Sequence, residues 1–505
     1  MKVCWPYFDP EFENFTERIY GPSPMGRKSL YGYVLELSSG LAFSSLEGCR
    51  VCIDNESCKE CTVVKVDTVN KQGLLLRVVQ ALTDMNLTIS KSYISSDAEW
   101  FMDVFHVKDE QGNKLTDQRV VNYIQQAIGA RKAPQDFNEV NTSTGEVVRA
   151  DASTGHIAIE LTGTDRPGLF SEISAALADL RCNVVEAHAW SHNEYLACVA
   201  YISDQSTSNC ITDPDRLAII KDHLSTVIHA TTSIDDIEAY NEQRVETVDL
   251  PGGGRDGIMT TNVEHRLHQL MLAGRDFEEP LGLTSISSSS SSPSINGEED
   301  GRKTIVSIES CNEKGYSIVS IECKDRRRLM FDTVCTLTDM QYVVFHASIR
   351  SHADSAIQEY YIRHIDGHTL ITDTEKKWVV KCLEAAIERR VCEGVRLELC
   401  AHNRVGLLSD ITRMLRENGL AVVRADVATQ GEKAMNAFYV RDVSGNEVDM
   451  EIVESMKREI EPLALEVKKD SPPRSIISPE RPRLSFSDLL KSHIGRFSHN
   501  FVQIK

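Results

Sequence analysis

One short turn, placed between an apolar segment and an amphipathic helix, occurs four times in this chain. Its clearest copy is residues 164–170, TDRPGLF, which follows the apolar run 157–161 and precedes Leu169, Ile173 and Leu177 at helical spacing. The other copies begin at Asn70, Asp325 and Asn403. Because 505 residues suggest three or four domains at about 150 residues each, the repeated turn predicts repeated α+β modules.

Each turn begins the same series of elements. A helix follows it, then two segments with alternating apolar residues, a second helix and a final strand. This is the split βαβ, or ferredoxin-like, order. We therefore expect an α+β fold with four ferredoxin-like βαββαβ repeats at 50–135, 146–234, 304–391 and 395–468, arranged in two tandem pairs, the first repeat with the second and the third with the fourth.

Short apolar segments at 51–53, 147–148 and 305–308 each stand one turn before a first strand. In this fold the last strand lies beside the first. A leading strand joined by a hairpin could fill the same position, which is our hypothesis for these repeats. The segment 145–148 is also compatible with a closing strand of repeat one.

The rest of the chain lacks this pattern. Residues 1–49 form an N-terminal extension that we expect to be poorly ordered. Residues 235–303 read as a disordered Ser-rich linker with one short helix near 263–272, expected to dock on a neighbouring domain. The alternative is a partner-binding helix. Residues 469–505 form a Pro/Ser-rich basic tail.

Composition excludes some classes of function. The net charge of -20 argues against nucleic acid as a partner, because phosphate binding needs a basic face. No apolar run reaches the roughly 20 residues of a membrane span. The fourteen cysteines lie mostly in apolar segments and predict reduced thiols, hence the cytoplasm, with the nucleus as the alternative. The pairs Cys49/Cys52 and Cys58/Cys61 are too close together for zinc-ribbon spacing, so we predict no metal.

The turn itself carries binding chemistry. It ends at a helix N-terminus, where backbone amides lack intrahelical partners and the dipole favours a carboxylate. Gly168 permits positive φ and close approach of a ligand, and Asp165 could accept from an ammonium group. Together they match the two ends of a free amino acid. The same residues also serve as an ordinary helix cap and turn.

The repeats resemble ACT domains, and the whole chain resembles the plant ACT domain repeat (ACR) proteins, which have four such modules. The matching stretches include VCIDN at 51–55, YISSD at 93–97, HRLHQ at 265–269 and DTVCTLTDM at 332–340. Residues 23–49 depart from the family pattern, as a splice or gene-model variant would.

The resemblance implies a non-enzymatic regulatory protein that binds a free amino acid of unspecified identity. In related domains an Asn in the turn and an Asn at the start of the second strand hold the ligand across a domain pair. The ligand-binding residues that follow are Asn70, Gly73, Leu74, Thr88, Asp165, Gly168, Leu169, Asn183, Asn403 and Gly406. Repeats one and two are expected to bind, and repeats three and four to be structural. Arg328 replaces the turn glycine in repeat three, so we expect that loop to differ in shape.

Two other functions are alternatives to amino-acid binding. An enzyme is disfavoured, because the chain has no nucleophile, P-loop or metalloprotease motif, so we predict no catalytic residue and no cofactor. The stronger alternative is a protein-interaction scaffold, in which ACT sheets pair with a protein partner or form a homodimer without any small ligand.

Overall fold

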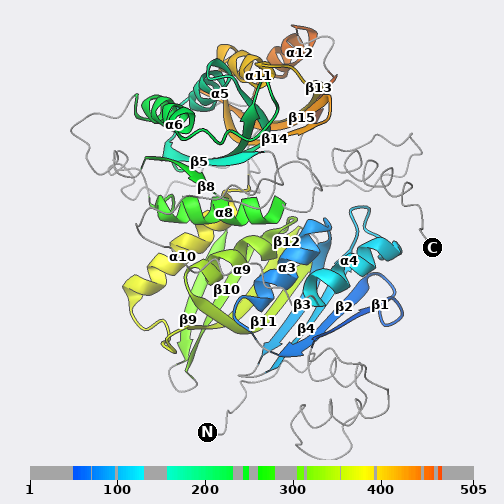
Figure 1. Cartoon of the computed structure of the whole chain (residues 1–505). Coiled ribbons are helices and arrows are strands. Elements are labelled where there is room, and N and C mark those ends of the chain that lie inside the picture. The colour runs from blue at the N-terminus through cyan, green and yellow to red at the C-terminus, as the bar shows by residue number, and fades with distance from the viewer. Residues whose placement is uncertain are drawn as a thin grey trace, which may run out of the picture. The chain divides into compact units, whose positions relative to one another are not determined.

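The computed structural model describes residues 49–69, 71–96, 100–129, 156–230, 243–248, 260–278, 304–311, 315–352, 354–391, 395–444, 448–459 and 464–468. The chain divides into two compact units, one from residues 1–139 and 299–383, the other from 140–298 and 384–505. Each unit contains one eight-stranded sheet with helices packed on it (Figure 1). The predicted N-terminal extension, Asn70, the segment 145–148, the serine run and the C-terminal tail lie outside the described residues, apart from Cys49.

Unit 1 is built from two modules. Module 1 comprises β1 (Cys49–Asp54), β2 (Thr62–Val69), α3 (Leu74–Asp84), β3 (Thr88–Ser96), β4 (Trp100–Lys108) and α4 (Gln118–Gly129). Module 3 comprises β9 (Ile305–Cys311), β10 (Tyr316–Lys324), α9 (Leu329–Asp339), β11 (Tyr342–His352), β12 (Ser355–His364) and α10 (Asp373–Glu388), whose last turn belongs to the second unit. The strand order is β1-β2-β4-β3-β11-β12-β10-β9, and the described pairings are antiparallel.

Unit 2 contains the other two modules. Module 2 comprises β5 (Ile157–Thr164), α5 (Leu169–Asp179), β6 (Cys182–His192), β7 (Tyr195–Asp204), α6 (Pro214–His229) and β8 (Arg244–Val248). The helix α8 (Thr260–Ala273) follows. Module 4 comprises β13 (Val395–His402), α11 (Leu407–Glu417), β14 (Leu420–Gln430), β15 (Lys433–Asp442), α12 (Met450–Glu459) and β16 (Ala464–Lys468). The strand order is β16-β13-β15-β14-β6-β7-β5-β8.

The pairing of modules corrects the sequence-based expectation. Module 1 pairs with module 3 through β3 and β11, and module 2 pairs with module 4 through β6 and β14. Neighbours in the sequence do not share a sheet. The physical reason is that every module presents the same kind of strand edge, so the pattern within a module does not select its partner. The two modules that pair do share one feature: each takes the strand at the outer edge of the sheet from the same end of its sequence, as described next.

The strand at the outer edge of a module comes from a different end of the module in the two units. In modules 1 and 3 it is the leading strand, β1 or β9, paired with the next strand of its own module, which confirms the hairpin hypothesis at these two places. In modules 2 and 4 it is the closing strand, β8 or β16. Strand β8 lies inside the segment expected to be linker, which corrects that expectation. It has five residues and, among the described strands, pairs with β5 alone, so its apolar pattern is short and weak.

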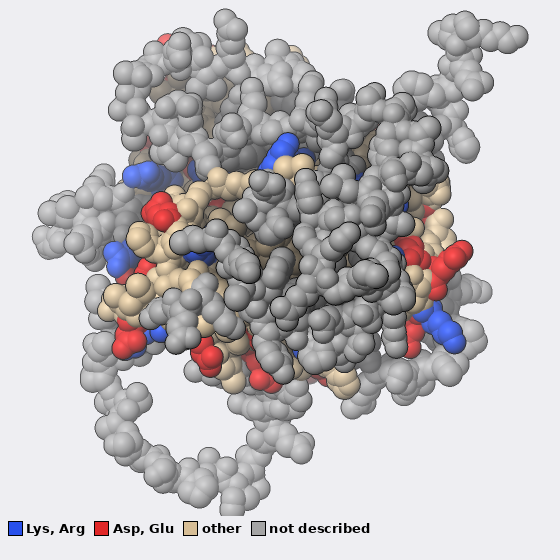
Figure 2. Space-filling model, turned by 90° about the horizontal axis from the view of Figure 1, so that it is seen from below, with Lys and Arg blue, Asp and Glu red and all other residues tan. Residues whose placement is uncertain are grey.

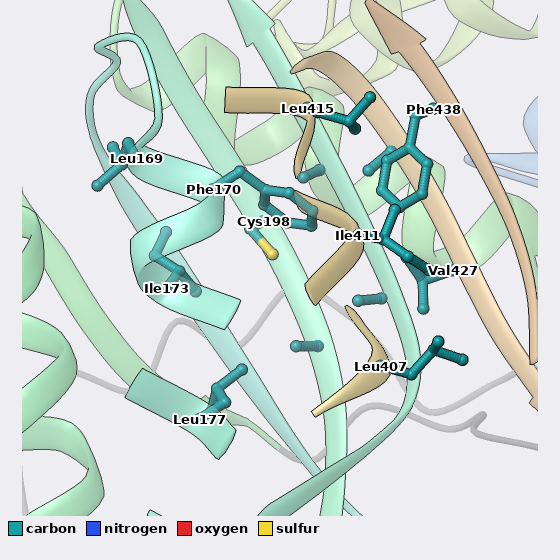
Figure 3. Packing of buried hydrophobic residues seen from close by; sticks show 14 of the residues in the cluster. Leu169, Phe170, Ile173, Leu177, Cys198, Leu407, Ile411, Leu415, Val427 and Phe438 are labelled. Carbon is teal, nitrogen blue, oxygen red and sulfur yellow. The ribbon is translucent and has the colours of Figure 1, made fainter. Parts of the chain in front are cut away.

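The two faces of β7 show where the cores of unit 2 lie. Leu196, Cys198, Ala200 and Ile202 join the core under the helices, which also holds the apolar faces of α5 and α11 (Figure 3). The alternate residues Ala197, Val199 and Tyr201 face a second cluster. That cluster contains Val263, Leu267 and Met271 of α8. The helix expected inside the linker therefore docks on the sheet of unit 2, as the sequence predicts.

None of the helices in the described segments combines the length and the apolar character that a membrane crossing requires. On the face drawn in Figure 2, Lys and Arg side chains of the described residues are interspersed with Asp and Glu side chains.

Candidate functional site

The four repeated turns share one backbone shape. The residue before the helix is left-handed in each: φ is 72° at Gly73, 89° at Gly168, 75° at Gly406 and 65° at Arg328. The expectation that Arg328 gives its loop another shape is wrong. A non-glycine residue adopts this conformation at a cost of only about 1–2 kcal/mol.

The arginines of the module 3 turn also make contacts that offset this cost. Arg328 Nη2 donates to Asn86 Oδ1 of module 1 at 3.4 Å. Its neighbour Arg327 donates from Nη2 to the Glu110 carbonyl oxygen at 3.0 Å. This turn thus binds to module 1 through its own side chains.

In three of the four turns the first helical amide already has a backbone acceptor. Leu74, Leu169 and Leu407 donate their N–H groups to the carbonyl oxygens of Lys71, Arg166 and Arg404, at 3.1, 3.0 and 3.1 Å. The amides of Leu74 and Leu169, which the sequence analysis assigns to a ligand, are therefore already engaged within the turn. In module 4 the next two amides, of Leu408 and Ser409, have no backbone acceptor within the described part of the chain. They are the orphan donors of the helix N-terminus.

A pocket opens at one of these turns, on the seam between modules 2 and 4. Module 4 contributes the turn 403–409 and inner residues of β14 and β15, and module 2 contributes the end of α5 and the start of β6. Its volume is about 40 Å³ for the centres of water-sized spheres, and about 450 Å³ when all the space between its walls and at its open mouth is counted. A methyl group added at Gly406 would meet nothing within 4 Å, so the turn leaves room for a ligand.

Three of the predicted site residues line this pocket. Asn403 and Gly406 come from the turn of module 4, and Asn183 comes from the first residues of β6 in module 2. The turn amide and the second-strand amide thus belong to different modules of one sheet. The other described site residues are not part of the lining of this pocket: Gly73, Leu74 and Thr88 belong to module 1, and Asp165, Gly168 and Leu169 to the turn of module 2.

The corresponding place at the turn of module 2 is filled by an arginine. A methyl group added at Gly168 would lie 2.6 Å from Cδ of Arg416, which comes from α11. Helices α5 and α11 have equal length and begin at Leu169 and Leu407, so the residue of α5 that corresponds to Arg416 is Ala178. Ala178 lines the open pocket. A small residue on one helix and a long one on the other therefore decide which turn is accessible.

Asp165 is occupied by its own surroundings. Its carboxylate accepts from Ser191 Oγ and from the Arg166 backbone amide, the latter at 2.9 Å. Burial raises the pKa of this carboxyl, although these hydrogen bonds and nearby arginines oppose the rise. The carboxylate that the sequence predicts as the acceptor for an ammonium group is therefore already hydrogen-bonded within module 2. At the matching place in module 4, no hydrogen bond of the Asn403 side chain is found among the described residues.

A further pocket residue, Asn436 of β15, was not predicted from the sequence. It is only 2% exposed, and its Oδ1 has no hydrogen-bond partner within the described segments. It pairs with Leu399 on one side and Val427 on the other, where the matching residue of module 2 is Cys198. Leaving a buried carbonyl unpaired costs about 1–3 kcal/mol. The one available signal was an amide within an otherwise apolar strand.

The polar lining of the pocket consists mainly of carboxamides, hydroxyls and backbone amides, with one charged side chain. Three carboxamides face it, from Asn183, Asn403 and Asn436, and the lining includes no Asp, Glu or His. Its charged member, Arg404, is paired through Nη2 with Asp410 Oδ2 at 2.6 Å. Carboxamides both donate and accept, so together with the two orphan amides they can satisfy a small molecule that carries both a carboxylate and an ammonium group.

Comparison with known proteins matches several segments to one family. The model of the ACR family N-terminal ACT domain matches residues 57–135, and ACT domain models match residues 156–209 and 395–458. The ACT domain-containing protein ACR2 of Arabidopsis thaliana is 56% identical over 529 positions, covering 100% of both chains. ACR3 of the same plant is 48% identical, covering 91% of this chain and 90% of its own.

A bifunctional uridylyltransferase/uridylyl-removing enzyme of Phenylobacterium zucineum is 31% identical over 103 residues, which are 20% of this chain and 11% of that enzyme. Similarity to the enzyme is thus confined to a small part of each protein.

Proposed function

This chain belongs to the ACR family of ACT domain-containing proteins, as its motifs predict, and we propose that it is a non-enzymatic sensor of a free amino acid. The ligand binds in the pocket between modules 2 and 4. The observation that carries the proposal is Asn436, a buried carboxamide at this pocket whose oxygen has no partner within the described residues. A ligand that donates a hydrogen bond to Asn436 Oδ1 would supply the missing partner.

The pocket offers a partner for each end of an amino acid. The amides of Leu408 and Ser409, at the N-terminus of α11, favour the carboxylate. The carboxamide oxygens of Asn183, Asn403 and Asn436 are acceptors for the ammonium group. Because these residues come from two modules, the ligand bridges the seam and stabilises one relative arrangement of its two sides. This proposal moves the binding pair from modules 1 and 2 to modules 2 and 4.

One further feature supports sensing without catalysis, and a second supports the proposed location. The pocket lining has no carboxylate or imidazole that could act as an acid or base. The described cysteines are free thiols, many of them buried, which supports the proposal of a cytoplasmic or nuclear location. Imaging of a fluorescent fusion tests that location.

A thermal-shift screen of the full chain against the twenty amino acids tests the function. One or two of them should raise the melting temperature, since a ligand at 100 times its Kd stabilises by about 2.7 kcal/mol. The shift should disappear in Asn403→Ala and persist in the control Asp165→Asn, which changes the corresponding residue of the closed turn. The proposal is contradicted if none of the twenty amino acids raises the melting temperature, or if N403A retains the shift.

The second candidate is a scaffold without a ligand. It is favoured by the seam between modules 1 and 3, where Arg327 and Arg328 of one turn bind module 1 directly. The strand edges at β3 and β11, and at β6 and β14, already pair within the chain. A protein partner or a second copy would therefore meet the outer strands or the helices. The thermal screen separates the two candidates.

A further inference from the structure

Two cysteines and a histidine meet in module 1, which belongs to the unit that does not contain the amino-acid pocket. Cys58 and Cys61 lie in the loop between β1 and β2, and His106 lies on β4, the strand beside β2. The Cys61 Sγ is 3.2 Å from the Cys58 Sγ and 3.3 Å from the His106 Nδ1. The three donor atoms all lie within 4.8 Å of one another.

The loop that carries both thiols is held in place at several points. Asp54 Oδ1 accepts from the amides of Glu56 and Ser57 at 2.8 and 2.9 Å. Asn55 donates from Nδ2 to the Leu115 carbonyl oxygen at 2.9 Å and accepts from Thr62 Oγ1 at 2.5 Å. Because side chains on both sides of the loop fix its path, the fold itself holds the two thiols beside the histidine.

Lys114 adds a further anchor to the same loop. Its ammonium group donates to the carbonyl oxygen of Asn55 at 2.7 Å and also to that of Cys58. These bonds fix the backbone at Cys58 and leave its thiol directed to Cys61. The loop therefore presents both sulfurs in a set geometry.

We propose that Cys58, Cys61 and His106 form a binding site for a zinc-like divalent cation. Two thiolates and one imidazole are a ligand set that tetrahedral zinc accepts, with a water or another ligand in the fourth position. Cys61 is buried, while Cys58 is partly exposed.

The geometry is close to what such an ion needs. Bond lengths of about 2.3 Å to sulfur and about 2.0–2.1 Å to nitrogen place two sulfurs about 3.8 Å apart and a sulfur and a nitrogen about 3.5 Å apart in a tetrahedron. The observed 3.2 Å between the two sulfurs and 3.3 Å between Cys61 Sγ and His106 Nδ1 require these pairs to separate by about 0.6 and about 0.2 Å, and the third pair, Cys58 Sγ and His106 Nδ1, already lies within 4.8 Å. Side-chain rotation supplies a movement of that size.

The sequence-based prediction of no metal rests on the spacing between the two CxxC pairs, which is too short for a zinc ribbon. The structure selects one pair only, since Cys52 is exposed on β1 and the third ligand comes from β4. A histidine 45 residues away from Cys61 leaves no spacing signal.

The test uses the full chain, reduced, stripped of metal with a chelator and kept free of air. Zinc titration against a chromophoric competitor, with cobalt substitution to report thiolate ligands by absorption, compares the natural protein with Cys58→Ser and with the control Cys52→Ser. We expect one zinc site that C58S weakens by more than the roughly 10–100-fold typical of losing an outer-shell partner. C52S should bind as the natural protein does.

Because Cys58 is partly exposed, C58S should fold normally, and a metal-free melting curve checks this. His106→Asn should also remove the thiolate-to-cobalt absorption. Equal zinc affinity in the natural protein and C58S overturns the proposal. So does a natural protein that takes up no zinc, including one in which Cys58 and Cys61 have joined as a disulfide.

Discussion

Replacing Asn436 by Cys should stabilise the ligand-free protein and abolish amino-acid binding. The substitution copies the arrangement in module 2, where Cys198 occupies the matching position of β7 and is 1% exposed in the same core. Cys is close to Asn in volume, so neither a large cavity nor crowding is expected. The carbonyl of Asn436, buried without a partner in the described part of the chain, is removed.

The size of the effect follows from that carbonyl. An unpaired buried polar group costs about 1–3 kcal/mol, so the free energy of unfolding should rise by about that amount. For a unit of roughly 150–250 residues, each kcal/mol raises the melting temperature by roughly 2–4 °C. Scanning calorimetry of the full chain, with and without the amino acid found in the screen, measures both the stability and the ligand-induced shift.

The reciprocal variant, Cys198→Asn, is the matched control. It places a carboxamide in the core below the turn that Arg416 closes, so it should destabilise by about 1–3 kcal/mol and leave ligand binding intact. The reasoning is refuted if N436C lowers the free energy of unfolding by more than about 1 kcal/mol, or if N436C keeps the full ligand shift.

Three other predictions address the seam between modules 2 and 4. Ala178→Arg should fill the open pocket as Arg416 fills its counterpart, and the ligand-induced thermal shift should be lost; an unchanged shift would place the ligand elsewhere. Arg416→Ala should change the free energy of unfolding by less than about 1 kcal/mol in urea titrations, because the partner of Arg416, Glu172, is 3.9 Å away and both side chains are partly exposed. Burial opposes the charge on His188, but its hydrogen bonds to Asp426 and Glu186 outweigh this and raise its pKa from 6.5 to about 10. Because the pKa is raised in the folded state, the stabilisation from charged His188 is complete below pH 6.5 and is lost as the pH rises through about 10. The urea midpoint of the natural protein should therefore fall over that pH range relative to the midpoint of His188→Gln. If the two midpoints change with pH in parallel, the raised pKa of His188 is contradicted.

The sequence predicts the interior of a module well. The helix after each turn begins at the expected leucine, Leu74, Leu169, Leu329 or Leu407, because glycine conformation and apolar spacing are both local properties. Arg328 shows the limit of a local rule. Its left-handed backbone carries an energetic cost, and contacts with Asn86 in another module, 242 residues away, offset it.

The site could be predicted only in part, because it is assembled from two modules. Asn183 and Asn403 were both identified from their places in a repeat, but their meeting depends on the pairing of β6 with β14. Arg416 and Ala178 acquire their opposite effects only once α5 and α11 face each other across that seam. Asn436 looks like a core position within its strand, and its unpaired oxygen becomes visible only when its neighbours are in place.

The central claim is that one chain has one amino-acid site, formed by the turn of module 4 and the second strand of module 2. Isothermal titration calorimetry of the full chain with the amino acid from the thermal screen tests it most directly. The account predicts one equivalent bound by the natural protein and by Asp165→Asn, and none by Ala178→Arg. Binding of one equivalent by A178R, or no binding by the natural protein, would contradict it.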